Sequence, residues 1–117
     1  MSLIIDLRDN PGGLLDVCVD IADYLLGEGT IVYTKDNNGD TQYYKSDEKK
    51  VDLPIVVLIN ENSASASEIL TAAIVDNKAG IAVGTTSYGK GLVQSVREFN
   101  DGTGYKLTTA QYYTPNG

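Results

Sequence analysis

A short serine-rich segment and one lysine are the residues of this chain best suited to chemistry. The segment Ser63–Ser67 alternates serine with alanine, directly after the apolar run Ile55–Ile59 and before an apolar helical pattern. A serine at such a strand-to-helix turn lies where helix N–H groups and the positive end of the helix dipole converge. There it can attack a carbonyl group, and backbone N–H groups can hold the resulting oxyanion.

A serine hydroxyl needs a base, and the composition of the chain limits the choice. The chain has no histidine, which excludes a Ser-His-Asp triad within these residues. Lysine can replace histidine where burial favours its neutral form. Lys90 is the best candidate because glycines and apolar residues flank it, whereas Lys49 and Lys50 lie among charged residues.

The same residues also fit purely structural roles. Ser65 and Glu68 have the spacing of a capping box, in which the serine caps the helix and the glutamate reaches back to the serine N–H. Serines before helices are far more often caps than nucleophiles, so the segment alone favours a cap. Lys90 alone is equally ambiguous, because most lysines are solvated surface charges.

Taken together, the motifs favour catalytic roles for these residues over purely structural ones. The segment Ser63–Ile69, followed by Tyr88–Gly91 and Gln94, resembles the C-terminal processing peptidases, also called tail-specific proteases (serine peptidase family S41), which use a Ser-Lys dyad. Three further segments agree with the family in the same order: Asp6–Gly13, Asp101–Thr108 and Tyr113–Gly117. The resemblance therefore covers nearly the whole chain.

The resemblance implies a role for each matched side chain. It makes Ser65 the nucleophile, Lys90 the general base, and Gln94 the residue that orients the lysine. Asp76 matches an acidic position of the family, where we expect a structural role.

The resemblance also implies an oxyanion hole made of backbone N–H groups. One would come from Ala66, directly after the nucleophile, and the other from the turn at Gly12 and Gly13. From the residues alone, a plain strand-to-helix connection is the favoured interpretation of this glycine turn.

The implied activity is that of a serine-type carboxyl-terminal processing peptidase. It would hydrolyse peptide bonds through an acyl-enzyme, in proteins or peptides with exposed, apolar C-terminal tails. The PDZ domain of the same full-length chain would capture the tail. The family's usual place is extracytoplasmic, in the periplasm or cell envelope and associated with a membrane, and the sequence leaves a homo-oligomer open.

Residues 1–117 are expected to be one part of such a catalytic domain, without the PDZ domain, the N-terminal region and the C-terminal remainder. A lysine in water is almost entirely protonated at neutral pH, so full assembly of the site must desolvate Lys90. We therefore expect this part alone to be a weak or inactive peptidase. Two alternatives remain: a non-proteolytic peptide-binding relative and a crotonase-like acyl-CoA domain.

The composition restricts the possible partners and ligands. The chain has 117 residues, which suits one compact domain, and its formal net charge of -7 argues against a nucleic-acid partner. Cys18 is the single cysteine, so no internal disulfide is expected, and its place in an apolar helical stripe predicts a core residue. With one cysteine and no histidine, we expect no metal site and no cofactor.

Two other patterns have ordinary explanations. The segment Asp36–Asp40 resembles a calcium loop, but Asp47 stands where such a loop needs its last glutamate, so a tight turn is the better reading. No stretch has the pattern of a signal peptide or a membrane span.

Apolar runs predict a mixed α/β fold with a mostly parallel sheet, flanking helices and antiparallel hairpins. The family resemblance implies that these elements form a crotonase/ClpP-like protease core. The predicted strands cover 3–7, 30–34, 41–45, 54–59, 81–84, 92–99 and 105–113. Helices are predicted over 14–25, with an apolar stripe in the core, and over 65–75. The order strand, helix, strand predicts that 3–7 and 30–34 pair in parallel. Strict alternation along 92–99 predicts that Gln94 faces away from Val93 and Ser95.

Overall fold

The computed structural model describes all residues 1–117 and contains seven strands and two helices. In chain order the elements are β1 (Leu3–Asp6), α1 (Leu15–Leu25), β2 (Gly29–Asp36), β3 (Thr41–Ser46), β4 (Ile55–Ile59), α2 (Ala66–Asp76), β5 (Gly80–Gly84), β6 (Leu92–Glu98) and β7 (Gly104–Tyr113). The elements agree with those predicted from the apolar patterns to within one or two residues at most ends.

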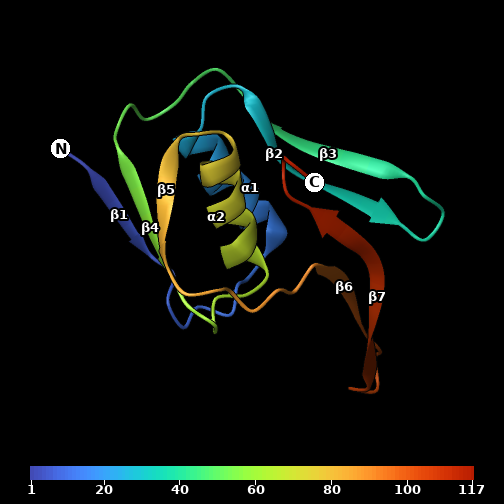
Figure 1. The fold of residues 1–117 in the computed structure, drawn as a ribbon. Coiled ribbons are helices and arrows are strands. Elements are labelled where there is room, and N and C mark those ends of the chain that lie inside the picture. Colours follow the sequence, from blue (N-terminus) through green and yellow to red (C-terminus); the bar gives the residue numbers. More distant parts are fainter.

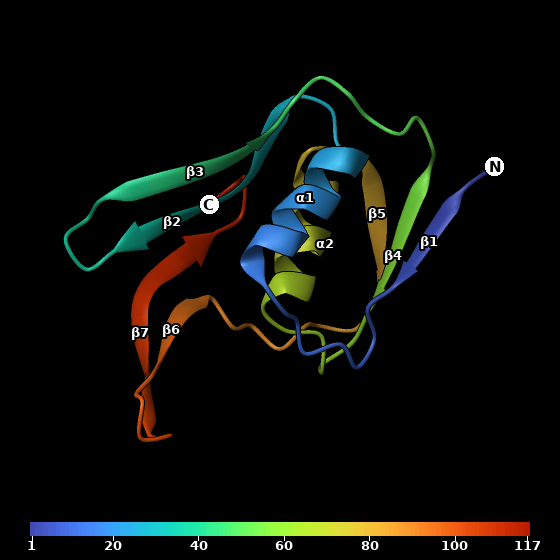
Figure 2. The ribbon, with the colours of Figure 1, turned by 180° about the vertical axis from the view of Figure 1, so that it is seen from behind.

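The strands form two separate sheets with the helices between them. One sheet is parallel, with the order β1-β4-β5, and the other is antiparallel, with the order β3-β2-β7-β6. Helices α1 and α2 lie side by side between the two sheets (Figure 1 and Figure 2). The predicted mixed α/β class, with a parallel sheet and antiparallel hairpins, is confirmed.

The predicted parallel pairing of the first two strands is wrong. β1 pairs with β4, and β4 pairs with β5, whereas β2 pairs antiparallel with β3 and β7. The uninterrupted apolar run of β4 suits the central strand of a parallel sheet, and its residues Ile55 and Val57 are buried in the core. The sequence of β2 instead ends in Thr34, Lys35 and Asp36 and continues into a hairpin, which suits an antiparallel sheet with a solvated face.

Both helices contribute to one core with the inner faces of the sheets. Helix α2 buries the predicted residues Ile69, Leu70, Ala73 and Ile74. Cys18 is buried in the same core, as predicted. The predicted core stripe of α1 is only half correct, since its buried residues are Cys18, Ala22 and Leu25 whereas Leu14, Val17 and Ile21 are exposed. The exposed residues lie on the side of α1 that no element of this chain covers.

The remaining connections are tight turns and one projecting hairpin. Asp36 Oδ1 accepts hydrogen bonds from the N–H groups of Asn38 and Asp40, so this segment is the predicted turn. The hairpin of β6 and β7 extends away from the helices (Figure 1), which gives the molecule its long axis of 51 Å. Neither helix has the length and apolar character that crossing a membrane requires.

Candidate active site

The loop after β1 lies directly against the turn that carries the serines. Ala64 N–H donates to the Asn10 carbonyl oxygen at 3.1 Å, and Ser67 Oγ donates to the same oxygen at 3.1 Å. Gly12 has a φ of 102°, and a β-carbon built on it would lie 2.8 Å from the Ser65 β-carbon and 2.7 Å from the Ala64 carbonyl oxygen. Only glycine allows this close approach in this backbone conformation.

Ser65 occupies a strained turn at the start of α2. Its φ of 55° and ψ of -118° are unusual for a residue with a side chain. Ser65 is the N-cap of α2, and the predicted capping box with Glu68 is present. The Ser65 N–H donates to Glu68 Oε2 at 2.9 Å. Such strain is typical of active sites, where the surrounding structure holds a reactive side chain in place.

Glu68 also holds the loop that carries the lysine. Its Oε2 atom accepts a hydrogen bond from Lys90 N–H at 3.0 Å, and its Oε1 atom accepts one from Gly89 N–H. One carboxylate therefore joins the backbone beside the serine to the backbone beside the lysine. The capping-box pattern identified Glu68 only as a cap, because the contact with residues 89 and 90 depends on tertiary structure.

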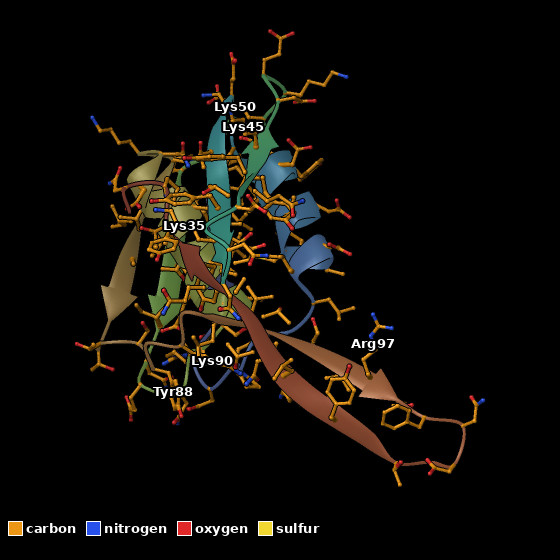
Figure 3. The ribbon with its side chains drawn as sticks, turned by 90° about the vertical axis from the view of Figure 1, so that its right-hand side faces the viewer. Lys35, Lys45, Lys50, Tyr88, Lys90 and Arg97 are labelled. Atoms are coloured by element: carbon orange, nitrogen blue, oxygen red, sulfur yellow. The ribbon has the colours of Figure 1, made fainter.

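The residues predicted for the site meet at one cavity of about 400 Å³. Its lining includes Ser65, Lys90, Gln94, Ala66 and Gly13. The other lining residues are mainly apolar: Leu14, Leu15, Ile69, Leu92, Val93, Val96, Lys106 and Tyr112. Lys90 lies beside Tyr88 where the chain enters the projecting hairpin (Figure 3).

Backbone N–H groups on two sides of this cavity have no acceptor in the protein. Those of Gly13, Leu14 and Leu15 lie where the loop after β1 enters α1, that of Ala66 lies at the start of α2, and all four residues line the same cavity as Ser65. Gly12 is not equivalent, because its N–H donates to Asn10 Oδ1 at 2.9 Å and Gly12 does not line this cavity. The geometry therefore distinguishes Gly13 from Gly12 as a donor toward the cavity, which the sequence did not.

The structure does not join the serine to the lysine by a hydrogen bond. The Lys90 side chain is half-buried and takes part in no ion pair, since the single ion pair of the chain joins Arg8 to Asp6. Gln94 Nε2 donates to Thr108 Oγ1 at 3.4 Å and forms no hydrogen bond with Lys90. The three residues thus line one cavity without hydrogen bonds between their side chains.

The predicted alternation around Gln94 is correct for Ser95, which does not line the cavity, but wrong for Val93. Val93 and Gln94 both line the cavity, because the pairing of β6 with β7 shifts register between these two residues. Such a β-bulge adds an unpaired residue and redirects the side chains that follow it.

An acid–amide cluster fixes the loop after β1 to the serine turn. Asp9 Oδ1 accepts hydrogen bonds from Asn62 Nδ2 at 2.8 Å and Asn60 Nδ2 at 2.9 Å, which lower the pKa of Asp9. Asp9 N–H in turn donates to Asn60 Oδ1 at 3.0 Å. Hydrogen bonds from Arg8 similarly lower the pKa of Asp6 to about 2. Sequence reasoning missed this cluster because Asp9 and Asn60 lie fifty-one positions apart.

Tyr112 and Asp76 make two further contacts between segments far apart in the chain. The Tyr112 hydroxyl lies 3.5 Å from the Ser65 carbonyl oxygen, and burial raises the pKa of this tyrosine. Asp76 Oδ2 accepts a hydrogen bond from Asn116 N–H at 3.1 Å, which agrees with a structural role for Asp76. No group of three or more acidic, cysteine or histidine side chains in the chain is arranged to hold a metal ion.

Comparison with known proteins identifies the family. The model of peptidase family S41 matches residues 1–117, and the chain therefore belongs to this family. A carboxyl-terminal-processing protease of Synechocystis sp. is 49% identical over 113 residues, which are 96% of this chain and 26% of the relative. A C-terminal processing peptidase of Tetradesmus obliquus, named as chloroplastic, is 41% identical over 118 residues, which are 99% of this chain and 25% of the relative.

Solved structures agree with this family. The structure of a photosystem II D1 C-terminal processing protease matches with a TM-score of 0.88 and 40% identity, covering 99% of this chain and 31% of that one. A lipoprotein from Streptococcus agalactiae matches with a TM-score of 0.81 at 21% identity, covering 99% of this chain and 45% of that one, and shares the fold. The chain spans about a quarter of the length of the curated relatives it matches.

Proposed function

We propose that this chain carries the Ser-Lys dyad of a serine endopeptidase, with Ser65 as the nucleophile and Lys90 as the general base. The observation that carries the proposal is the meeting of Ser65, Lys90 and the unpaired N–H groups of Gly13 and Ala66 at one cavity of about 400 Å³. Membership of peptidase family S41 supports the same reaction class.

In the proposed reaction, Lys90, Ser65 and the two backbone N–H groups each have a defined role. Neutral Lys90 accepts the proton of Ser65 Oγ while this oxygen attacks the scissile carbonyl carbon. The N–H groups of Ala66 and Gly13 donate to the oxyanion that forms. Lys90 then gives its proton to the leaving amine, and water hydrolyses the acyl-enzyme on Ser65.

The reaction requires the lysine to move toward the serine. No hydrogen bond joins the two side chains in the structure, so the Lys90 side chain must turn toward Ser65 Oγ when a peptide is bound. Gln94 lines the same cavity, and its 3.4 Å hydrogen bond to Thr108 is weak enough to exchange for one to Lys90. We therefore assign Gln94 the orientation of the lysine.

The names of the relatives supply the proposed substrate class. These relatives are carboxyl-terminal-processing proteases, so we propose substrates with exposed, apolar C-terminal tails for the full-length protein. We further propose that a PDZ domain of the full-length chain delivers the tail to the cavity. The family resemblance also leads us to propose a place outside the cytoplasm, which fractionation of cells with an antibody to the protein would test.

A fluorophosphonate probe tests the nucleophile directly, because it reacts with an activated serine rather than with any hydroxyl. We expect the full-length protein to be labelled at Ser65 and to cleave a peptide with an apolar C-terminal tail. Ser65→Ala and Lys90→Ala should each lower kcat/KM by about 10³-fold or more. Ser95→Ala is the matched control, since this serine is exposed on β6 and does not line the cavity.

Three results would contradict the proposal. Full labelling and cleavage by the Ser65→Ala variant would place the nucleophile elsewhere. Tight binding of a CoA ester without labelling or cleavage would support the acyl-CoA alternative, and peptide binding without cleavage would support a non-proteolytic binding protein. Residues 1–117 alone are expected to cleave the same peptide far more slowly than the full-length protein, because Lys90 is only half-buried here.

A further inference from the structure

The cavity at the proposed active site has a basic lining in an acidic protein. The chain has 16 acidic and 9 basic residues. No aspartate or glutamate lines the cavity that contains Ser65, whereas two lysines, Lys90 and Lys106, do. Most of the other lining residues are apolar. A lining of this kind attracts a negatively charged group of a bound peptide.

Lys106 reaches this cavity from the projecting hairpin. It lies on β7 directly opposite Val96 of β6, and Val96 also lines the cavity. Gln94 lines the cavity two residues before Val96. Two residues of a strand span about 7 Å. Lys106 is therefore displaced along the hairpin from Gln94, the proposed orienting residue of the lysine base.

The charge of Lys106 has no partner in the chain. Its side chain is exposed and forms no ion pair. It also lies over no aromatic ring, whereas Lys35 and Lys45 each lie over a tyrosine ring. Glu98 follows Val96 on the same face of β6, but it forms no ion pair with Lys106 and does not line the cavity. The Lys106 ammonium group is thus free to bind a group of the substrate.

The two other charged groups beside this cavity already have partners or a role. The Glu68 carboxylate accepts hydrogen bonds from backbone N–H groups on both sides and lines a different cavity. Lys90 acts on Ser65 in the proposed reaction. Lys106 therefore remains as the cation of the lining that is available for binding.

We propose that Lys106 is a specificity-determining residue of the peptidase, which binds a substrate carboxylate roughly two residues from the scissile bond. This inference rests on the proposed function and narrows its substrate class to apolar tails with an acidic group near the cleavage site. The carboxylate belongs either to an aspartate or glutamate side chain or to the C-terminus of a tail that ends close to the cleavage site. The apolar lining, which includes Val96, contacts the neighbouring side chains of the substrate.

Matched peptides test the charge preference in the full-length protein. All peptides share one apolar sequence and one C-terminal tail, and each carries glutamate or glutamine at a single position near the scissile bond. At one position we expect the glutamate peptide to be cleaved with a kcat/KM about two- to fivefold higher than that of its glutamine counterpart. The difference should lie in KM and should shrink at high salt, because salt screens an exposed ion pair.

Variants of Lys106 show whether this residue causes the preference. Lys106→Gln should remove the preference, and Lys106→Glu should reverse it in favour of a peptide with lysine at the same position. A reversed preference cannot come from a folding defect. Arg97→Glu is the matched control, because Arg97 is exposed on the same hairpin (Figure 3), does not line the cavity and undergoes the same change of charge. A glutamate preference that persists in Lys106→Gln would overturn the proposal.

A second pair of peptides identifies the source of the carboxylate. Both peptides end two residues after the scissile bond and contain no acidic side chain, and they differ in a free or an amidated C-terminus. Faster cleavage of the free acid, lost in Lys106→Gln, identifies the C-terminus as the ligand. Equal rates for this pair, together with the glutamate preference, identify a side chain. Equal rates in both series refute the carboxylate site.

Binding to the full-length Ser65→Ala variant separates this inference from the proposed function. Fluorescence anisotropy of labelled glutamate and glutamine peptides measures their affinities without cleavage. Tighter binding of the glutamate peptide, lost when Lys106→Gln is added, supports the carboxylate site even if the wild-type protein cleaves nothing and the proposed function fails. Cleavage by the wild-type protein with no charge preference refutes the carboxylate site and leaves the proposed function intact.

Discussion

The approach of Gly12 to the serine turn leaves no room for a side chain. A β-carbon at this position would contact the Ala64 carbonyl oxygen and the Ser65 β-carbon at distances that real structures do not tolerate. Backbone atoms of a tightly bonded turn cannot move aside cheaply, so the glycine is required by packing as well as by its φ of 102°.

Gly12→Ala is therefore expected to destabilise the protein by about 1–3 kcal/mol and to displace the Gly13 N–H from the cavity. Gly13→Ala is the matched control for stability, since a β-carbon there meets no atom within 4 Å. Urea unfolding of both variants measures the difference. Equal stability of the two variants would show that the loop moves freely, contrary to the structure.

Asp9 links the loop after β1 to the serine turn and makes this link sensitive to acid. Hydrogen bonds from Asn62 and Asn60 lower the pKa of Asp9 in the folded state below its value in the unfolded chain. A lowered pKa contributes stability that is complete above the unfolded value of about 3.9 and is lost as the pH falls through the folded value.

We therefore expect the wild-type protein to lose more stability than Asp9→Asn when the pH is lowered from about 5 to below 3. The asparagine keeps the side-chain size and tolerates the φ of 59°. Denaturant unfolding at a series of pH values gives the two curves. Asp20→Asn, on the exposed side of α1, serves as control and should follow the wild type. Parallel curves for wild type and Asp9→Asn would exclude Asp9 as the acid-sensitive group.

At the scale of the elements, α2 and the lysine loop are held together by one side chain. Glu68 accepts hydrogen bonds from the N–H groups of Ser65, Gly89 and Lys90, so its carboxylate defines the distance between the two proposed catalytic residues. A glutamine has one oxygen acceptor in place of two and carries no charge, so it cannot replace all three hydrogen bonds.

Glu68→Gln should cost about 1–3 kcal/mol of stability and lower kcat more than KM changes, because the loop with Lys90 loses its anchor. Glu61→Gln is the control, since Glu61 lies on the exposed side of the same turn and accepts a hydrogen bond from Thr85 at 3.0 Å. Unfolding and peptide-cleavage kinetics of the pair measure both effects. A Glu68→Gln variant with wild-type kcat would show that the carboxylate does not position the lysine.

At the scale of the whole molecule, one buried thiol reports on the packing of both helices. Cys18 on α1 donates through Sγ to the Ala66 carbonyl oxygen on α2 at 3.3 Å, and burial raises the pKa of this thiol to about 11. A protonated and inaccessible thiol reacts slowly, because the thiolate is the nucleophile.

We expect iodoacetamide at pH 8 to alkylate Cys18 in the native protein at least about 100-fold more slowly than in denaturant. Because the chain has a single cysteine, mass spectrometry reads the reaction without ambiguity. The rate in strong denaturant is the reference. A native rate close to this reference would mean that α1 and α2 separate readily, in conflict with the observed core.

The sequence predicted the elements well because each has a clear local pattern. The apolar run of β4 and the period of α2 need only their own residues to be recognised, and so does the turn at Asp36–Asp40. The local sequence pattern gave wrong predictions where strand pairing or burial depends on which other element lies next to it. β1 pairs with β4 rather than β2, and three apolar residues of α1 are exposed, because pairing and burial depend on which surfaces meet in space.

The same distinction applies to the candidate site: some of its features follow from the sequence, and others only from the tertiary structure. Residue types and their order indicated the family and led to the proposal of the serine, the lysine and the glycine turn, since the absence of histidine leaves lysine as the candidate base for a serine nucleophile. Only the tertiary structure distinguished the Gly13 N–H from that of Gly12. It also showed that Glu68 accepts hydrogen bonds from both the serine turn and the lysine loop. It alone brought the Tyr112 hydroxyl to within 3.5 Å of the Ser65 carbonyl oxygen. The physical reason is that hydrogen-bond partners and access of water depend on contacts between segments far apart in the chain, which no local pattern specifies.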